Sequence, residues 1–418
     1  MTAERVPALR RAAREVAPAA VAWRRAIHAQ PEPAYAERQT AALVAAALDD
    51  LGLEVRTGVG GTTGVVGLLR GDGPRQDGPG KVIAIRADMD ALPIPGIDPK
   101  DVPYRTEVEG VRHVCGHDAH VAMALGMATV LARVRDQWAG TVKLLFEPAE
   151  ECLGTDLKPG AVALVEAGVL DAPAVDAVLA LHVFPEYSTG TVALRPGVIM
   201  TGMDLLDLDV LGEEAHSSTP QKGADAIVAA AHVILALQTL ASRETDPTAA
   251  VAVNLGTIQG GHGPRNLLAD RVALRGLVRA SDPALRAELP ERVARIAGHA
   301  AAALRARCEV QVTPFLPYVQ NDPALAERFI TAVSAALGPA RVLRLAQPRL
   351  VGESFFAYSE RVPSVFAFLG TGNPARPETQ WPSHHPRFDL DEDALEHGIL
   401  ALSAATLDLL DSGTASRR

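Results

Sequence analysis

Three apolar stretches of the sequence each run into side chains that can bind a metal ion or move a proton. The stretches lie at 82–85, 141–146 and 177–181, and they are followed by Asp88 and Asp90, by Glu147, Glu150 and Glu151, and by His182. Short apolar, β-branched runs between breaker residues are typical of buried strands. The intervals between them leave room for strand–helix–strand units, and open α/β sheets carry their chemistry at the carboxyl ends of strands. The pattern therefore predicts an α/β fold with one site at an edge of the sheet.

A fourth group of possible ligands lies in the loop that contains Cys115 and His117, at the start of a segment with helical spacing, 117–134. A soft thiolate beside an imidazole nitrogen suits zinc or another borderline transition ion, and each ligand binds only when it is deprotonated. The loop alone is equally compatible with a free buried cysteine next to surface histidines. The acids and the histidine at three other strand ends favour the metal site.

The acids also have simpler interpretations. Asp88 and Asp90 could order the loop that follows their strand, and Glu150 and Glu151 could form an exposed acidic pair. Such a pair is unusual directly after a buried strand, and neighbouring side chains in an irregular segment past Pro148 point in different directions. One glutamate could therefore face metal ions while the other takes a proton from a water and returns it to a leaving group.

The length and charge of the chain limit the classes of protein to consider. With 418 residues, two domains are expected, because a single hydrophobic core stops growing well below that size. The net charge of −10 argues against a nucleic-acid or acidic-membrane partner, which requires a basic surface. The odd number of cysteines, Cys115, Cys152 and Cys308, forms no disulfide framework, and residues 1–25 lack the apolar region of a signal peptide. No apolar run approaches the ~20 residues of a membrane span, so we expect a soluble cytoplasmic protein.

The pattern changes between about residues 201 and 315. Strands are predicted at 205–211, 250–258, 272–278 and 309–312, and helices at 224–243 and 281–307. The order β-α-β-β-α-β is that of a ferredoxin-like unit, an antiparallel sheet covered on one face by two helices. We predict an inserted satellite domain at 201–315, and a catalytic domain built from 1–200 and 316–418.

Blocks of residues along nearly the whole chain resemble one family. They are Arg24-Arg25-Ala-Ile-His28-Ala-Gln-Pro31-Glu32, Arg86-Ala-Asp88-Met-Asp90-Ala-Leu-Pro93, Cys115-Gly-His117-Asp118-Ala-His120, Pro148-Ala-Glu150-Glu151, Leu181-His182-Val-Phe-Pro185, Ala215-His216, Gly260-Gly261 leading to Asn266, Gly276-Leu-Val-Arg279, Gly352-Glu353 and His384-His385-Pro386. The sequence is similar to the metallo-amidohydrolases that include hippurate hydrolase, indole-acetyl-amino-acid hydrolases and bacterial N-acyl-amino-acid aminoacylases. These form a branch of the zinc carboxypeptidase-like superfamily.

The resemblance implies a site for two divalent metal ions, which could be Zn, Mn, Co or Ni. Its ligands would be Cys115, His117, Glu151, His182 and His384, with Glu150 as the catalytic acid and base. The family pattern places the last ligand two residues before a proline, which favours His384 over His385 and leaves the choice between them open. Asp88 and Asp90 would orient ligands.

The resemblance also implies a substrate and a partner. His216 would stabilise the oxyanion from the partner subunit of a homodimer formed through the satellite domain, which would also act as a lid. Asn266 and Arg279 would hold the carboxylate of an N-acyl amino acid, although Arg279 alone would be interpreted as a surface arginine at a strand end. The implied reaction is hydrolysis of the amide bond. A dipeptidase, a carboxypeptidase, an N-carbamoyl-amino-acid hydrolase and an inactive metal-binding homologue remain alternatives.

Three departures from the family pattern remove no proposed ligand. Ser354 occupies a position where relatives usually carry Asp, and Ala269 replaces a common proline after Asn266. The segment from Cys152 to Gly160 is longer than the usual glycine-rich link. These departures leave the identity of the substrate, but not the reaction, open.

Overall fold

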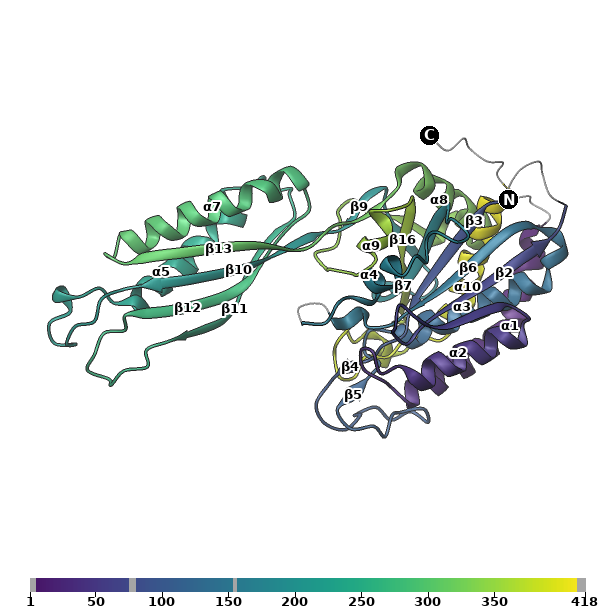
Figure 1. Ribbon diagram of the computed structural model, residues 1–418, viewed down its shortest axis with the longest axis horizontal. Helices are drawn as coiled ribbons and strands as arrows, with labels where there is room; N and C mark the ends of the chain where they lie inside the picture. Colours follow the sequence, from purple (N-terminus) through teal and green to yellow (C-terminus); the bar gives the residue numbers. More distant parts are fainter. Residues whose placement is uncertain (1–4, 75–79, 153–155, 412–418) are drawn as a thin grey trace. The chain divides into compact units, whose positions relative to one another are not determined.

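The protein was analysed as a computed structural model, which describes residues 5–74, 80–152 and 156–411 (Figure 1). The chain forms two compact units. The first, called the catalytic unit, takes in 1–197, 320–346 and 354–418, and the second, called the satellite unit, takes in 198–319 and 347–353. Strands β9 (Gly197–Met200) and β14 (Val319–Asn321) lie where the chain passes from one unit to the other.

The described part of the catalytic unit contains helices and strands from both ends of the chain. The helices are α1 (Arg5–Ala29), α2 (Arg38–Asp50), α3 (His117–Arg133), α4 (Gly160–Glu166), α8 (Pro323–Leu337), α9 (Phe356–Ser359) and α10 (Ala394–Asp411), with short 3-10 turns η1 (Arg135–Gln137), η2 (Glu150–Cys152), η4 (Pro339–Arg341) and η5 (Pro377–Gln380). The strands are β1 (Glu54–Val59), β2 (Gly64–Asp72), β3 (Val82–Asp88), β4 (Leu92–Pro93), β5 (Val111–Arg112), β6 (Ala139–Glu147), β7 (Ala177–Ser188), β8 (Val192–Leu194), β15 (Val342–Arg344) and β16 (Ser364–Gly372).

A mixed sheet of eight strands forms the centre of the catalytic unit. Its order is β1-β2-β6-β3-β7-β16-β8-β15, and its middle strands β6, β3, β7 and β16 run parallel. These four strands are apolar and almost wholly buried, as parallel strands must be when helices cover both faces. The predicted α/β fold is therefore confirmed.

Helices lie on both faces of this sheet. A Cβ atom on Gly64 of β2 would meet Leu164 of α4, whereas one on Gly67 would meet Leu48 of α2. Residues three apart on a strand point to opposite faces, so α4 and α2 cover opposite sides. Helices α1, α3, α8 and α10 pack against one another in a connected layer.

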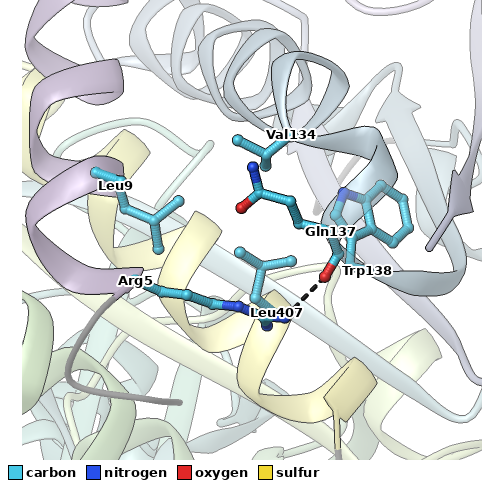
Figure 2. Close-up of a pocket in the computed structure, with 7 residues that line it drawn as sticks. Arg5, Leu9, Val134, Gln137, Trp138 and Leu407 are labelled. Carbon is cyan, nitrogen blue, oxygen red and sulfur yellow. Dashed lines mark hydrogen bonds between the residues drawn. The ribbon is translucent and has the colours of Figure 1, made fainter. Parts of the chain in front are cut away.

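The first and last helices meet around a small apolar pocket (Figure 2). Leu9, Val134, Trp138 and Leu407 line it, and Arg5 closes it by donating through Nη2 to the carbonyl of Gln137 at 2.7 Å. The second guanidinium nitrogen of Arg5 lies 2.6 Å from the carboxylate of Asp411. Residues from both ends of the chain line the pocket, and the described residues of its lining include no group of acids, histidines or cysteines.

The central strands end at different heights, which corrects one prediction. Strands β3 and β6 end side by side, with Asp88 paired to Glu147. Strand β7 continues to Ser188, because β16 still pairs with it after β3 has left the sheet, and Phe368 of β16 lies opposite His182. His182 therefore lies within a strand and not at its end, next to the space that β3 leaves open.

Several short elements were missed from the sequence. Strand β1 is mostly exposed and carries polar residues, so it has no apolar pattern, and β8 and β15 are only three residues long. The helix α9 at Phe356–Ser359 is a single turn.

The satellite unit has the predicted ferredoxin-like fold. Its elements are β10 (Gly202–Leu211), η3 (Pro220–Lys222), α5 (Ala226–Leu237), α6 (Thr239–Arg243), β11 (Val251–Gly260), β12 (Arg271–Ala280), α7 (Pro283–Ala302) and β13 (Arg307–Leu316). The strands form an antiparallel sheet of order β11-β12-β10-β13, and α5 and α7 bury their apolar residues against it. The helix predicted at 224–243 is two helices, which meet at Gln238.

One stretch among the described helices, Ala226–Arg243, is long and apolar enough to cross a membrane by length and composition alone. In the structure its α5 part places Ala229, Ala230 and Val233 in the core of the satellite unit. About a third of the stretch, 33%, is buried in this way.

Candidate metal centre

The structure divides the predicted site residues between the two units. The catalytic unit holds Asp88, Asp90, Cys115, His117, Glu150, Glu151, His182 and His384, and the satellite unit holds His216, Asn266 and Arg279. The first group is gathered at one place, from five separate segments of the chain.

Gly116 sets the shape of the loop that carries the thiol. Its φ of 94° is a conformation that glycine adopts readily, and a Cβ atom there would lie 2.1 Å from Val183 Cγ2. Gly116 therefore turns the chain between Cys115 and His117 at the start of α3. Ligand atoms of Cys115, His117 and Glu151 lie within 4.8 Å of one another, and Cys115 Sγ lies 3.5 Å from His182 Nε2.

Two of the imidazoles present a nitrogen to this cluster. His117 Nδ1 lies 2.9 Å from the carbonyl oxygen of Asp90, and His182 Nδ1 lies 2.7 Å from that of Val183. A carbonyl can only accept, so each Nδ1 carries a proton, and Nε2 is the atom that offers a lone pair when the ring is neutral. Burial lowers the pKa of His182 well below its usual value, which keeps this ring neutral and able to bind a metal.

His120 is close to the same cluster but has both ring nitrogens engaged. Its Nδ1 lies 2.5 Å from Asp88 Oδ1, and its Nε2 accepts the amide N–H of Val183 at 2.9 Å. The other oxygen of Asp88 accepts from Arg86 Nη1 at 2.7 Å and lies 3.5 Å from His117 Nε2. Asp88 and His120 thus hold the ligand-bearing segments in place.

The two glutamates begin the 3-10 turn η2, and Asp90 fixes the backbone there. The amides of Glu150 and Glu151 donate to the two oxygens of the Asp90 carboxylate at 3.0 and 2.9 Å. Glu150 Oε1 accepts the backbone N–H of Ser354 at 3.0 Å, whereas Glu151 Oε1 lies 3.8 Å from His117 Nε2. The two side chains point in different directions, as the sequence predicted for an irregular segment.

The C-terminal loop brings His384 rather than His385 to the cluster. His384 Nε2 lies 3.1 Å from Glu151 Oε1, and the His384 amide donates to the carbonyl of Val114 at 2.7 Å. His385 instead stacks on Trp381 at 4.2 Å between ring centroids, and its Nδ1 accepts the amide of Arg387. The geometry supports His384 as the ligand.

The cluster is surrounded by buried carboxylates, whose negative charge a bound cation would offset. Burial and the nearby Glu151 and Glu150 carboxylates raise the pKa of the Cys115 thiol well above its usual value. Burial alone would lower the pKa of His117, but Asp88, Asp90 and Glu151 raise it to about 10. The contributions of the carboxylates to both shifts express an excess of buried negative charge.

The donor set fits a divalent transition metal. Thiolate, imidazole and carboxylate together suit borderline ions such as zinc. Within the described residues, His117 Nε2 is buried and has no hydrogen-bond partner, and it faces Glu151 Oε1. A buried ring nitrogen without a partner is costly unless something binds it. The residues present are therefore suited to hold a cation at this point.

The residues predicted to grip the substrate lie in the satellite unit. His216 is exposed and its Nδ1 lies 2.7 Å from Ser218 Oγ. Arg279 lies on β12 and donates to the carbonyl of Leu350, and burial lowers its pKa. Asn266 is exposed on the loop before β12, and its backbone carbonyl accepts the backbone N–H of Ser217 at 2.8 Å. The roles of these three residues stay predictions.

The departures from the family pattern have different settings. Ala269 lies in the core of the satellite unit. Residues 153–155 of the longer segment after Cys152 lie outside the described residues, and Cys152 itself is buried with its Sγ 3.7 Å from the carbonyl of Leu157.

Ser354 belongs to a buried network that the sequence did not reveal. Arg86 Nε donates to Glu147 Oε2 at 2.8 Å, and Arg86 Nη2 lies 3.1 Å from Ser354 Oγ. The Ser354 hydroxyl donates to Glu147 Oε1 at 2.5 Å, and Tyr358 donates to Glu147 Oε2 at 3.2 Å. The only cue in the sequence was Arg86 itself, a charged residue two places before Asp88 on a strand that is otherwise apolar.

An aspartate at position 354 would place a carboxylate directly against that of Glu147. We therefore expect Ser354→Asp to lower the free energy of unfolding by roughly 2–4 kcal/mol, because it buries a like charge. Adding Glu147→Gln should restore most of this loss. Denaturant unfolding of both single variants and the double variant measures the coupling. Ser354→Ala is the control, and its free energy of unfolding should fall by about 1 kcal/mol because one hydrogen bond is lost. A double variant that is no more stable than Ser354→Asp would contradict the expectation.

Comparisons with known proteins agree with this geometry. A probable hydrolase of Synechocystis sp. is 38% identical over 397 residues, covering 95% of this chain and 97% of its own. Thermostable carboxypeptidase 2 of Saccharolobus solfataricus is 35% identical, covering 90% and 92%. N-acetyl-L-cysteine deacetylase of Bacillus subtilis is 34% identical, covering 94% and 89%.

Solved structures give the same result. The YXEP protein of Bacillus subtilis, described as a dinuclear metal binding peptidase from the M20 family, superposes with a TM-score of 0.79 at 30% identity, covering 96% of this chain and 99% of its own. The family profile named Peptidase family M20/M25/M40 matches residues 84–408. That range includes every candidate residue of both units, and the chain belongs to peptidase family M20/M25/M40.

Proposed function

We propose that this protein hydrolyses the amide bond of N-acylated amino acids and releases a carboxylic acid and a free amino acid. Its class, a metal-dependent amidohydrolase, follows from the family and from its named relatives. The observation that carries the proposal is the position of Glu150, whose buried carboxylate begins the same turn as Glu151 beside the cluster of Cys115 and His117.

Two divalent metal ions, Zn, Mn, Co or Ni, are proposed as cofactors. The residues that would hold them are Cys115, His117, Glu151, His182 and His384. When bound, such ions polarise a carbonyl group and lower the pKa of water from 15.7 to roughly 7. The cytoplasm that we propose as its location would keep the Cys115 thiol reduced.

Within this site, Glu150 moves the proton. Its Oε1 is fixed by the Ser354 amide, so the carboxylate has one preferred direction. We assign it the removal of a proton from the attacking water and the return of that proton to the leaving amine. Glu151 faces His117 and His384 instead, which leaves the two glutamates with separate tasks.

The acyl amino acid is favoured as substrate by the relatives and by the satellite residues. One relative is named a deacetylase of an N-acetyl amino acid. Arg279 and Asn266 are proposed to hold the carboxylate of the amino-acid part, for which a planar guanidinium is well shaped. A relative named as a carboxypeptidase favours a peptide substrate as the second candidate.

A panel of substrates decides between these candidates. We expect the enzyme, supplied with Zn, Mn or Co, to hydrolyse N-acyl amino acids faster than dipeptides or N-carbamoyl amino acids. An N-acyl amino acid whose carboxylate is replaced by an amide should be a poor substrate. Arg279→Met should abolish this preference for the free carboxylate over the amide. Glu150→Gln should lower kcat by at least about a hundredfold with unchanged metal content. Hydrolysis of none of the panel would refute the proposed function, and a near-normal rate in Glu150→Gln would remove Glu150 from its role.

Cys115 tests the metal site separately from activity. We expect Cys115→Ser to hold less metal, because a hydroxyl does not replace a thiolate as a soft ligand. Elemental analysis after dialysis against a chelator gives the stoichiometry. Cys308→Ser is the matched control, since that cysteine lies on β13 of the satellite unit. Equal stoichiometry in both variants would count against the thiolate as a ligand.

A homodimer through the satellite unit is proposed as the working form, with the satellite domain also serving as a lid. Strand β11 is the edge of its sheet, and Ile258 on it is 59% exposed. On α5, Ile227, Val228 and Leu235 are also exposed, and Leu235 is 69% exposed. An apolar strand edge next to an apolar helix face is a surface that soluble proteins normally cover. A second copy of the chain can pair with it symmetrically.

Hybrid dimers test both the dimer and the proposed action of His216 from the partner subunit. We expect Glu150→Gln and His216→Ala each to be nearly inactive. When the two are refolded together, half of the dimers are hybrids and each has one intact site, so about a quarter of wild-type activity should return. Leu235→Asp should abolish this recovery and give a monomer by analytical ultracentrifugation. Hybrids without any activity would mean that His216 does not act across the dimer.

A further inference from the structure

The turn that leads into the two glutamates has a strained backbone. Ala149 has a φ of 52°, in the left-handed region that residues with a Cβ atom adopt rarely and at a cost. Its side chain is fully buried, so contacts within the protein must hold the residue in this conformation. This residue immediately precedes Glu150, and any change in its φ and ψ would redirect the backbone of η2.

The carboxylate of Glu37 holds this residue. Glu37 Oε1 accepts the Ala149 amide at 2.8 Å, and the same oxygen accepts the amide of Tyr35 at 2.9 Å. Tyr35 also has a positive φ, 61°. The hydroxyl of Thr63 donates to the other oxygen, and Glu37 is fully buried. One buried carboxylate therefore binds the amides of two residues in the left-handed conformation.

Glu37 holds this position at the expense of its own helix. It is the N-cap residue of α2, yet its side chain makes no hydrogen bond to that helix. Glu32 supplies the missing caps, since its carboxylate accepts the amides of Gln39 and Thr40 at 2.9 Å. The N-cap side chain is normally used to satisfy the first amides of a helix. Here it is turned toward the segment that carries the glutamates.

The remaining contacts of the turn make Ala149 its adjustable point. Asp90 already fixes the amides of Glu150 and Glu151, and the Met89 amide donates to the carbonyl of Glu147 at 2.8 Å. A Cβ atom on Gly160 would lie 1.6 Å from the carbonyl oxygen of Pro148, so the chain is tightly packed there. The backbone on both sides of Ala149 is therefore held, and its carbonyl accepts the Gly160 amide at 3.3 Å. The Ala149 amide is held from a distant segment, by Glu37.

We propose that Glu37 is a positioning residue for the reaction: its carboxylate keeps Ala149 in the left-handed conformation and so sets the separate directions of Glu150 and Glu151. The inference rests on the roles proposed for those two glutamates. Without Glu37, Ala149 relaxes toward negative φ, its amide turns away, and the hydrogen bonds from η2 to Asp90 lose their geometry.

The test uses the full-length, metal-loaded enzyme with changes at two positions. We expect Glu37→Ala to lower kcat about tenfold while KM changes less than about twofold, because misplacement of a catalytic group costs rate rather than binding. Glu37→Gln should stay within about twofold of wild type, since its amide oxygen accepts the same two amides. Ala149→Gly combined with Glu37→Ala should recover most of the loss, because glycine adopts positive φ without support.

Glu32→Ala is the matched control. It removes a carboxylate that also binds backbone amides, but only those of α2, so stability should fall and kcat should not. A Glu37→Ala variant with the kcat of this control would overturn the inference, as would a double variant that recovers nothing. If Glu37→Ala does not fold, the double variant decides. A folded double variant with near wild-type kcat supports the inference, and a double variant that is unfolded or has a low kcat overturns it.

The unfolding free energies of wild type, Glu37→Ala, Ala149→Gly and the double variant separate this inference from the proposed function. Coupling between positions 37 and 149 is measured by denaturant unfolding and needs no substrate. Inactive wild-type enzyme with strong coupling would refute the proposed function alone. Active wild-type enzyme without coupling, and without a kcat defect in Glu37→Ala, would refute the role of Glu37 alone.

Discussion

The carboxylate of Asp90 is the group on which the arrangement of the catalytic unit depends. It accepts the amides of Glu150 and Glu151, and it lies 3.3 Å from the protonated Nδ1 of His117. It thereby joins the loop after β3, the turn after β6 and the start of α3. The first amides of a helical turn have no partner within the turn, so an acceptor supplied from outside decides where the turn begins. One side chain thus fixes three segments that are distant in the sequence.

The same gathering of acids makes the unit dependent on positive charge. Arg86 offsets Asp88 and Glu147. The partners of Glu151 are instead the rings of His117 and His384, which carry a positive charge only when they are protonated. A buried carboxylate without a partner charge is costly. Metal affinity and folding stability are linked in such a cluster, because a cation that binds the folded state also removes the repulsion within it.

The sequence predicted those parts of the site that follow from periodic structure. Asp88, Glu150 and Glu151 could be placed because each follows an apolar strand, and parallel strands bring such residues to one edge. His182 was assigned to a strand end although it lies within β7, because the length of a strand depends on the neighbour that continues to pair with it. His384 comes from a loop without any period, so only the resemblance to a family indicated it.

Glu37 and Ser354 could not be predicted, and the reason is physical. Both positions contact the segment of Glu150 and Glu151 through backbone amides: Glu37 accepts the amide of Ala149, and Ser354 donates its own amide to Glu150. Every residue except proline has such an amide, so its use leaves no mark in the sequence. The backbone of residue 354 therefore supplies an N–H to the site, whereas its side chain is hydrogen-bonded to Glu147 and Arg86. A serine in place of an acid at this position changes the charge of the supporting network and leaves the contact with Glu150 intact.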